Sequence, residues 1–463
     1  MRMAVLAAAV LAVIPASFAP AQHTHGGTPD SAATRAFPPG MDMGPDHGDM
    51  AGMQHDRDTM MGMEHEAGHG ASSSHPLGFR HGRFGSGTSW LPDATPARHL
   101  MTHAGGWTVM GHGAAFAGGV AMNGPRGDRK AFAPHMVMLM AERGNGRTYG
   151  RLGTMLSADA ATVGGAGYPL LFQTGETWND DPLHDHQHPH NVVSELSATI
   201  ARGIGRSAAV TLYAAPVGEP ALAGSCSSPS GLAVLAPIGH HWQDATHIAY
   251  GVLTAGFETR RWRVEASTFN GREPGENRAA IIGPRFDSAS GRLSVNPSPS
   301  LAFQVSHGYL HRPESAHPGE DAWRSTASLV WVHPSGERRS FDIALVAGRN
   351  RVHRESLDSW LVEGEWDGED GFIPFARVEY VEKTAEELVL AAPFDPARVF
   401  PLRQATLGLI YNLPLHGALS WGIGGQLVAS APGRDLRPVY GSDPGGWSAF
   451  LRIRPRAMRH MEM

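Results

Sequence analysis

The sequence contains a single cysteine, which excludes an intramolecular disulfide framework. That residue, Cys226, stands in a Gly-Ser-Cys-Ser-Ser stretch that is typical of a loop. Beyond residue 21 no apolar run reaches the roughly 18 residues of a membrane-spanning helix, so a membrane location would have to use strands. Lysine is scarce and the formal net charge is -6, which argues against a nucleic-acid surface.

The first residues of the chain predict export. Arg2 supplies a short positive region, an almost uninterrupted apolar run follows over 4–18, and Ala19-Pro20-Ala21 fits the small-x-small pattern that a signal peptidase cuts. The run is too short for a spanning helix with a stop-transfer sequence. We therefore expect residues 1–21 to be a signal peptide and the mature chain to begin near Gln22.

The remaining chain changes character twice. Residues 22–86 are rich in Gly, His, Met, Asp, Ser and Pro and almost lack Val, Ile and Leu, so we expect this segment to be disordered. Residues 87–103 form a transition that could be a plug or a linker. We expect a barrel over 104–455 and a C-terminal tail over 456–463. The 57 glycines fit a β protein with many turns and do not fit a helical bundle.

Alternation with a period of two residues determines the expected fold. In the segment 261–269, Arg263 and Glu265 alternate with Trp262 and Val264. The same period recurs in four further segments, at 192–200, 357–366, 372–382 and 447–454. Such alternation predicts strands with one apolar and one polar face.

Two details favour a transmembrane barrel over a soluble β-sandwich. The apolar faces begin or end in aromatic residues such as Trp360, Phe372 and Trp447, and the opposite faces carry charges in mid-strand, as a wet lumen allows. A sheet cannot leave open edges in lipid, so it would have to close. At roughly 22 residues for each strand and turn, we expect about 16 strands, within a range of about 12–18. The predicted fold class is an all-β, antiparallel transmembrane β-barrel.

Methionine and histidine are concentrated in the segment 22–86. Thioether sulfur is a soft ligand and imidazole an intermediate one, and together they suit Cu(I) and Cu(II) better than Mg or Ca. The acidic residues between them make zinc or nickel possible metals as well. The alternative interpretation is a disordered linker of accidental composition. The candidate ligands in this segment are Met41, Met43, His47, Met50, Met53, His55, Met60, Met61, Met63, His65 and His69.

Two further histidine-rich stretches are candidate metal ligands within the expected barrel. Asp185 could orient a neighbouring imidazole from outside the ligand set. We expect His247 on the lumen-side face of the strand 246–257, opposite Ile248, Tyr250 and Val252. The alternative is a pair of solvated polar loops, and the sequence leaves open whether the two stretches meet. The candidates are His184, His186, His188, His190 and Glu195 in the first stretch, and His240, His241, Asp244 and His247 in the second.

Signals for a particular enzyme are weak. Gly224-Ser225-Cys226-Ser227 is not a nucleophile elbow, no glycine-rich phosphate loop is present, and no residue is assigned as catalytic. A barrel hydrolase or lipid-modifying enzyme that uses the His and Glu loops remains one alternative function. A general porin is another.

Several stretches resemble a family of largely uncharacterised bacterial envelope proteins. They are 87–96, 164–177, 185–190, 218–221, 240–246 and 269–278. The resemblance runs from about residue 87 to the C-terminus. It implies a barrel and an association with copper or heavy-metal resistance, and it assigns no catalytic residues. The segment 22–86 is similar in style to the Met/His-rich leader of copper resistance protein B, another expected outer-membrane barrel.

The sequence thus leads to one principal hypothesis. We expect an outer-membrane barrel that binds copper and serves copper tolerance or its transport across the envelope, with its N-terminal segment in the periplasm. The expected partners are outer-membrane lipid, metal ions and periplasmic copper-handling proteins, and we expect no nucleic acid.

Overall fold

The computed structural model describes residues 73–223, 234–336, 338–352, 355–368 and 370–457. The chain divides into the units 1–67 and 68–463, and every described residue belongs to the second. The part of the predicted disordered segment before residue 73 lies outside the described residues. Residues 73–86 were expected to be disordered too, and this expectation was wrong, because Leu77 and Phe79 are buried with Trp90 in a small apolar cluster.

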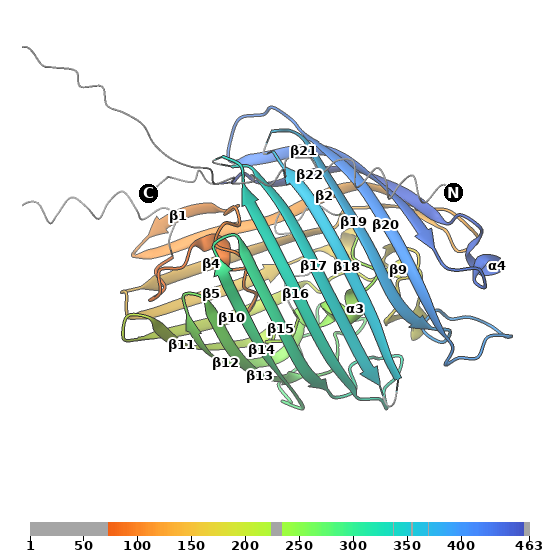
Figure 1. The fold of residues 1–463 in the computed structure, drawn as a ribbon, viewed down its shortest axis with the longest axis horizontal. Helices are drawn as coiled ribbons and strands as arrows, with labels where there is room; N and C mark the ends of the chain where they lie inside the picture. Colours follow the sequence, from red (N-terminus) through yellow and green to blue (C-terminus); the bar gives the residue numbers. More distant parts are fainter. Residues whose placement is uncertain (1–72, 224–233, 337, 353–354, 369, 458–463) are drawn as a thin grey trace, which may run out of the picture. The chain divides into compact units, whose positions relative to one another are not determined.

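In the described part of the chain, sixteen antiparallel strands close into a barrel (Figure 1), which confirms the predicted fold class and falls within the predicted range of strand numbers. They are β2 (Trp107–Met122), β4 (His135–Gly144), β5 (Thr148–Leu156), β10 (Val193–Ile204), β11 (Ala208–Gly218), β12 (Ala249–Thr259), β13 (Trp262–Asn270), β14 (Ser288–Ser298), β15 (Leu301–Leu310), β16 (Ala322–Pro334), β17 (Ser340–Val352), β18 (Glu355–Asp367), β19 (Gly371–Thr384), β20 (Val399–Asn412), β21 (Leu419–Ala431) and β22 (Gly445–Pro455). In the described residues, no helix is long and apolar enough to span a membrane.

Strand β2 closes the barrel by pairing on two sides. Its residues 108–115 pair with β4, and its residues 115–122 pair with the last strand, β22. Two short strands extend the sheet beside it: β1 (Leu100–Ala104) pairs with the start of β2, and β3 (Arg129–Phe132) pairs with its end. The closing strand therefore joins the first and last parts of the barrel wall.

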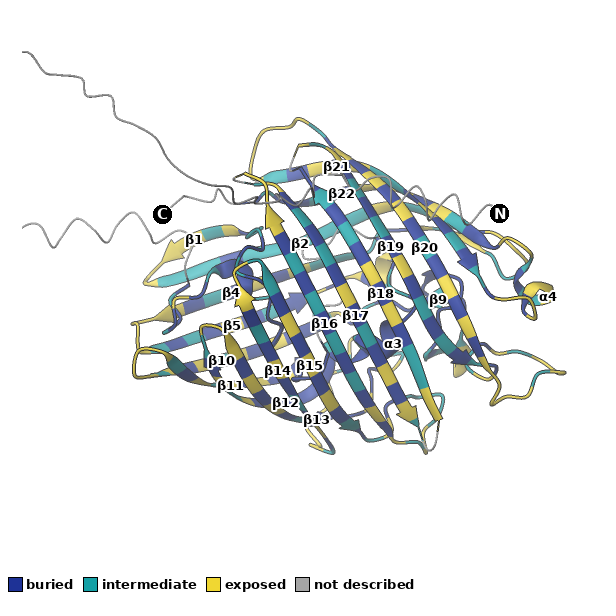
Figure 2. Ribbon diagram, viewed as in Figure 1, coloured by how far each residue is buried: buried dark blue, intermediate teal, exposed yellow. Residues whose placement is uncertain are grey.

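The alternation seen in the sequence becomes the two faces of the wall. Arg263 and Glu265 are buried and point into the lumen, whereas Trp262 and Val264 are exposed on the outside. Figure 2 shows the same alternation of buried and exposed positions along β16 to β20. Many of the exposed positions are apolar, such as Trp360, and together they form the outer belt that a lipid bilayer requires.

The face expected for strand β12 was wrong. His247 lies before the strand, in the short 3-10 turn η2 (Ala245–His247), and Tyr250 and Val252 are buried instead of facing outward. The pairing of β12 with β13 shifts register between Tyr250 and Leu253, where Gly251 adopts a positive φ of 61°. The shift does not exchange the faces of β12, because Tyr250, Val252 and Thr254 are all buried while Leu253 and Phe257 are exposed. Tyr250 and Val252 face inward because they belong to buried apolar clusters with Val217 and Leu222, which a prediction of a purely polar lumen did not anticipate.

The two ends of the barrel differ. At one end the strands are joined by short connections, such as 145–147, 205–207 and 299–300; we call this the short-turn end. At the other, the long-loop end, the connections 157–192 and 219–248 are long. This asymmetry is usual for barrels of the outer membrane.

Residues 73–99, which we call the inner segment, lie against lumen-facing side chains of the wall. The segment contains one 3-10 turn, η1 (His81–Arg83). The Arg292 side chain donates hydrogen bonds to the Thr88 carbonyl, and the Gly87 N–H donates to Glu195 at 2.9 Å. The segment therefore occupies part of the lumen.

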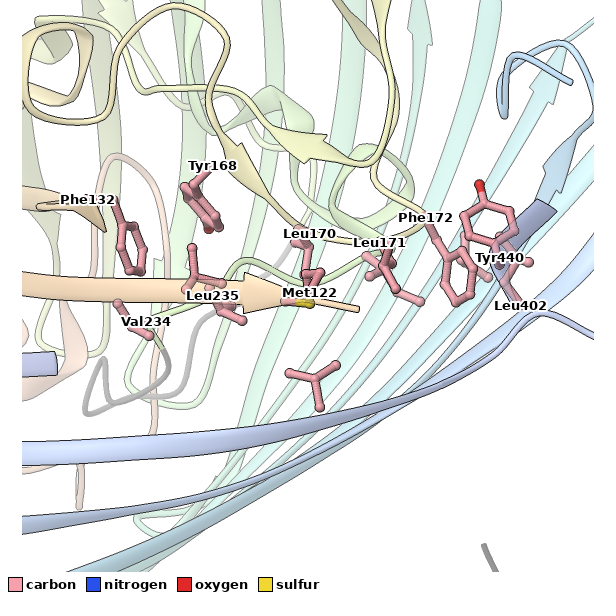
Figure 3. Packing of buried hydrophobic residues seen from close by; sticks show 14 of the residues in the cluster. Met122, Phe132, Tyr168, Leu170, Leu171, Phe172, Val234, Leu235, Leu402 and Tyr440 are labelled. Carbon is pink, nitrogen blue, oxygen red and sulfur yellow. The ribbon is translucent and has the colours of Figure 1, made fainter. Parts of the chain in front are cut away.

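The two long connections also contribute residues to the interior. The first contains α2 (Asp159–Thr162), β6 (Tyr168–Pro169), β7 (Glu176–Trp178), β8 (Asp181–Leu183) and β9 (His186–Gln187), and the second contains α3 (His240–Gln243) and η2. Leu170, Leu171 and Phe172 belong to the largest buried apolar cluster (Figure 3). Phe172 packs edge-on to Tyr440 of α4 (Arg437–Tyr440), with ring centroids 4.9 Å apart. The same cluster contains Val234 and Leu235 of the second connection and Leu402 of β20, so both loops pack against the wall.

Candidate metal centre

The two histidine-rich stretches meet inside the barrel. His188 and His190 come from the first long connection, and His240, His241 and His247 come from the second. The ring centroid of His188 lies 5.7 Å from that of His240 and 5.6 Å from that of His241. The rings of His190 and His247 are 5.8 Å apart. The structure thus answers the question that the sequence left open, since five of the candidate histidines form one cluster.

Local structure explains why α3 can present its side chains here. The Asn350 side chain on β17 donates a hydrogen bond to the His241 carbonyl at 3.0 Å, and the Gln243 side chain donates to Ser359 on β18 at 3.1 Å. Gly348 lies so close to the Trp242 carbonyl that a Cβ atom there would approach within 2.3 Å. The short helix is therefore held rigidly on the wall, and its histidines point into a fixed space.

Two overlapping groups within the cluster have the spacing of metal ligands. One ligand atom from each of His188, His240 and His241 lies within 4.8 Å of the others. The same holds for His240, Asp244 and His247. His240 is common to both groups, so it is the central residue of the candidate site.

His188 has the environment of a metal-binding histidine. Its Nδ1 lies 3.1 Å from a carboxylate oxygen of Glu176, and Glu176 is itself held by a buried ion pair with Arg278. Its Nε2 is buried and has no hydrogen-bond partner among the described residues. Metal-ligating histidines usually have one nitrogen fixed by a carboxylate or carbonyl while the other binds the ion.

His241 repeats this arrangement with different partners. Its Nδ1 lies at an ion-pair distance of 3.3 Å from a carboxylate oxygen of Glu273, and neither ring nitrogen has a partner in hydrogen-bond geometry among the described residues. Gly175, with a φ of 114°, packs against the ring, and a Cβ atom there would lie 2.6 Å from Nε2. Only glycine allows the two chains to approach so closely at this point.

Two further histidines of the cluster are also fixed through Nδ1. The Nδ1 of His190 lies 2.8 Å from a carboxylate oxygen of Asp159, and the Nδ1 of His247 lies 2.7 Å from the Asp244 carbonyl oxygen. Three imidazoles from two loops therefore have Nδ1 held by an acceptor, and the Nδ1 of His241 faces a carboxylate at an ion-pair distance. This recurrence is expected when the other nitrogen serves a common ligand.

Burial controls the charge of the cluster. It lowers the pKa of His188 and of His240 well below the ordinary value and lowers the pKa of His247 to about 4, so these rings are neutral at pH 7. Burial is also the largest single influence on His241, but the carboxylates of Glu273, Glu314 and Glu176 together outweigh it and raise the pKa of that ring. Neutral imidazole is the form that binds a cation, so a proton competes with the metal most strongly at His241.

The cluster borders a cavity of about 430 Å³ in the lumen. His240, Asp244 and His247 line one part of the cavity, and His99, His112 and Met138 line another. The cavity is large enough for a hydrated ion to reach the histidines.

Other predicted site residues lie apart from the cluster. The side chains of His184 and His186 face Asp185 and Asp128, with nitrogen–oxygen distances of 3.0 and 3.4 Å, and both are partly exposed. Glu195 is buried and accepts hydrogen bonds from the Gly87 N–H and the Ser197 hydroxyl. These three residues are therefore absent from both candidate ligand groups. The candidates from Met41 to His69 lie outside the described residues.

Prediction from the sequence missed the groups that support the cluster. Glu176 and Asp159 stand earlier in the connection that carries His188 and His190, Glu273 lies in the connection after β13, and no local motif marks any of them. It also missed a group of lumen-facing methionines on β4, although the alternation His135-Met136-Val137-Met138-Leu139-Met140 was a signal that could have revealed it.

Taken together, the closed antiparallel wall, its apolar outer belt and its polar lumen define an outer-membrane β-barrel. No family model and no curated protein matches the sequence. Among solved structures, the chain is similar to Salmonella typhi OmpF in complex with daunomycin (TM-score 0.48, 10% identity, covering 76% of this chain and 100% of that chain). It is also similar to an anion-selective porin from Comamonas acidovorans (0.46, 9%, 75% and 99%) and to the channel DcaP of Acinetobacter baumannii (0.45, 8%, 76% and 99%).

Proposed function

We propose that this outer-membrane barrel binds a transition metal, copper in the first instance, inside its lumen and serves copper tolerance or transport across the envelope. The observation that carries the proposal is that two loops bring His188, His240 and His241 together. A carboxylate faces the Nδ1 of both His188 and His241. Imidazole ligands suit copper, zinc and nickel, and they do not select Mg or Ca.

The methionines and histidines between Met41 and His69 favour copper among these metals. Thioethers are soft ligands that bind Cu(I) and add little affinity for zinc or nickel. In this proposal the segment lies in the periplasm, receives copper from periplasmic copper-handling proteins, and raises the local metal concentration near the barrel.

The test is the metal content of the detergent-purified mature chain after equilibration with Cu(II). We expect His240→Ala to lose about one copper ion per chain, because His240 belongs to both ligand groups. His333→Ala is the matched control, since His333 is an exposed histidine of the wall, away from the cluster. Measurement by elemental mass spectrometry in a variant lacking residues 22–72 separates lumen copper from copper bound by the N-terminal segment. Equal copper content in His240→Ala and the control would refute the lumen site.

A general porin is the second candidate function, and the 16-stranded barrel itself favours it. A porin needs an open lumen, whereas here the inner segment and two loops occupy part of it. The two functions differ in one measurable property: a porin conducts ions irrespective of copper, and its conductance does not depend on His240.

A further inference from the structure

A second group of metal-ligand side chains lies on the lumen wall, away from the histidine cluster. Strands β2, β4 and β5 place methionine or histidine at neighbouring lumen-facing positions. Met110 pairs with Met140 across β2 and β4, His112 pairs with Met138, and Met138 pairs with Met155 across β4 and β5. The four methionines are at most 7% exposed. We call these residues, together with His99, the sulfur patch.

Imidazole and thioether groups already touch within this patch. The Nε2 of His112 lies 3.0 Å from the Sδ of Met138. Because the two residues are direct cross-strand partners on a closed sheet, their backbones are fixed and their side chains are held on one face. A nitrogen and a sulfur donor are therefore available at one point of the wall.

The inner segment brings His99 over these two residues. The ring centroid of His99 lies 5.5 Å from that of His112. His99 is 8% exposed, and neither of its ring nitrogens has a hydrogen-bond partner among the described residues. A buried polar group without a partner is destabilising, and native proteins rarely leave one in place without a reason. A bound cation would give the His99 ring its missing partner.

The chemistry of the patch selects a soft, singly charged ion. Its donors are neutral nitrogen and thioether sulfur. The carboxylates of Glu142 and Glu195 on the neighbouring wall accept hydrogen bonds from the Tyr149 hydroxyl and the Gly87 N–H. Thioethers favour Cu(I) over harder divalent ions.

We propose that His99, His112 and Met138 form a site for monovalent copper, with the neighbouring methionines of the patch as further sulfur donors. This site is separate from the histidine cluster, and both line the same cavity of about 430 Å³. The lumen thus holds a sulfur-containing site on strands β2 and β4 and an imidazole site on the two long connections. The proposal extends the proposed function but does not depend on the imidazole site.

Silver(I) is the probe, because it is a soft monovalent ion that stays in one oxidation state. The full mature chain is equilibrated with Ag(I) or, separately, with Cu(II), and bound metal is counted by elemental mass spectrometry. We expect Met138→Leu combined with His99→Gln to lose one silver ion per chain and to keep its full Cu(II) content. Met122→Leu is the matched control, because Met122 is a buried methionine at the other end of β2.

The variants also separate this site from the proposed function. Met138→Leu nearly conserves side-chain volume, so we expect a folded barrel, which the heat-modifiable mobility of the protein in gels checks. His240→Ala should show the opposite pattern, with Cu(II) lost and silver kept. Silver content equal to that of Met122→Leu would overturn the sulfur site and leave the imidazole site standing. Loss of Cu(II) together with silver in the double variant would also overturn it as a separate site.

Discussion

At the scale of single residues, the carboxylates behind the histidines are the groups that turn a histidine-rich loop into a defined site. Glu176 faces the Nδ1 of His188 and is held by Arg278, so the ring orientation is set by two further layers of contacts. We predict that Glu176→Gln weakens copper binding about 10–100-fold, because the neutral amide no longer orients and polarises the imidazole. A competition titration of the purified chain with a chromogenic Cu(II) chelator measures the change.

The control for this prediction is Glu363→Gln. Glu363 forms a comparable buried ion pair with Arg377 on the wall, and no histidine contacts it among the described residues. Both substitutions leave a buried arginine without its carboxylate partner. If the two variants weakened copper binding equally, the effect would come from the stability of the barrel and the role of Glu176 would be rejected.

The sequence predicted the histidines but not the carboxylates that face them. Residue type and local density pointed to His188 and His240 without their positions in space. Glu176 stands earlier in the same connection as His188 and Glu273 lies in the connection after β13, and both reach the cluster only through the folding of these loops in the barrel. His184 and His186 carry the same local signal as His188, but they lie apart from the cluster, partly exposed. Local composition therefore predicted which residue types bind, while tertiary contacts decided which of them meet.

At the scale of elements, the inner segment and the barrel wall fit together through close contacts that a side chain would disrupt. Gly87 has a positive φ of 52°, and a Cβ atom there would lie 2.4 Å from the Cβ of Glu219. We predict that Gly87→Val displaces the inner segment and raises ion conductance several-fold in planar bilayers. The physical reason is that the backbone of residue 87 cannot retreat while Arg292 holds the Thr88 carbonyl.

Gly78→Val separates this steric effect from backbone strain. Gly78 also has a positive φ, of 64°, and a Cβ atom there meets nothing within 4 Å. Both variants carry the same left-handed strain of about 1–2 kcal/mol, but only one collides with the wall. High conductance in the unaltered chain, or equal conductance in the two variants, would contradict closure by this segment and favour a general porin.

The start of the inner segment could not be predicted from the sequence. A plug or linker was expected from residue 87, but the chain already contains buried residues from residue 73 onward. Leu77 and Phe79 are only two apolar residues in a polar, glycine-rich stretch, too few to predict a folded element. They are buried because the inner face of the barrel wall covers them. Strand β12 was assigned the wrong face for a related reason, since Tyr250 and Val252 are apolar but face inward, where they are buried with Val217 and Leu222.

At the scale of the whole molecule, the fold could be predicted because each strand carries two independent chemical faces. Charges in mid-strand require a wet or charge-paired interior, and apolar residues on the alternate positions require lipid or another apolar layer. Counting strands from average spacing gave about 16, since most hairpins have similar length. The short strands β1 and β3 beside β2 could not be foreseen, because they depend on how the first and last strands meet.

The outer belt provides the last prediction. Leu345 on β17 and Val362 on β18 are cross-strand partners on the outer face and are 40% and 48% exposed. If this face meets lipid, Leu345→Arg should lower the free energy of unfolding by about 2–4 kcal/mol, because a charge near the bilayer midplane loses its hydration. Ser356→Arg, at an exposed position near the long-loop end of β18, should cost only about 0–1 kcal/mol. Urea unfolding of the two variants in lipid vesicles measures the difference. A small, equal cost for both would mean that the belt around Leu345 does not lie in the hydrocarbon core.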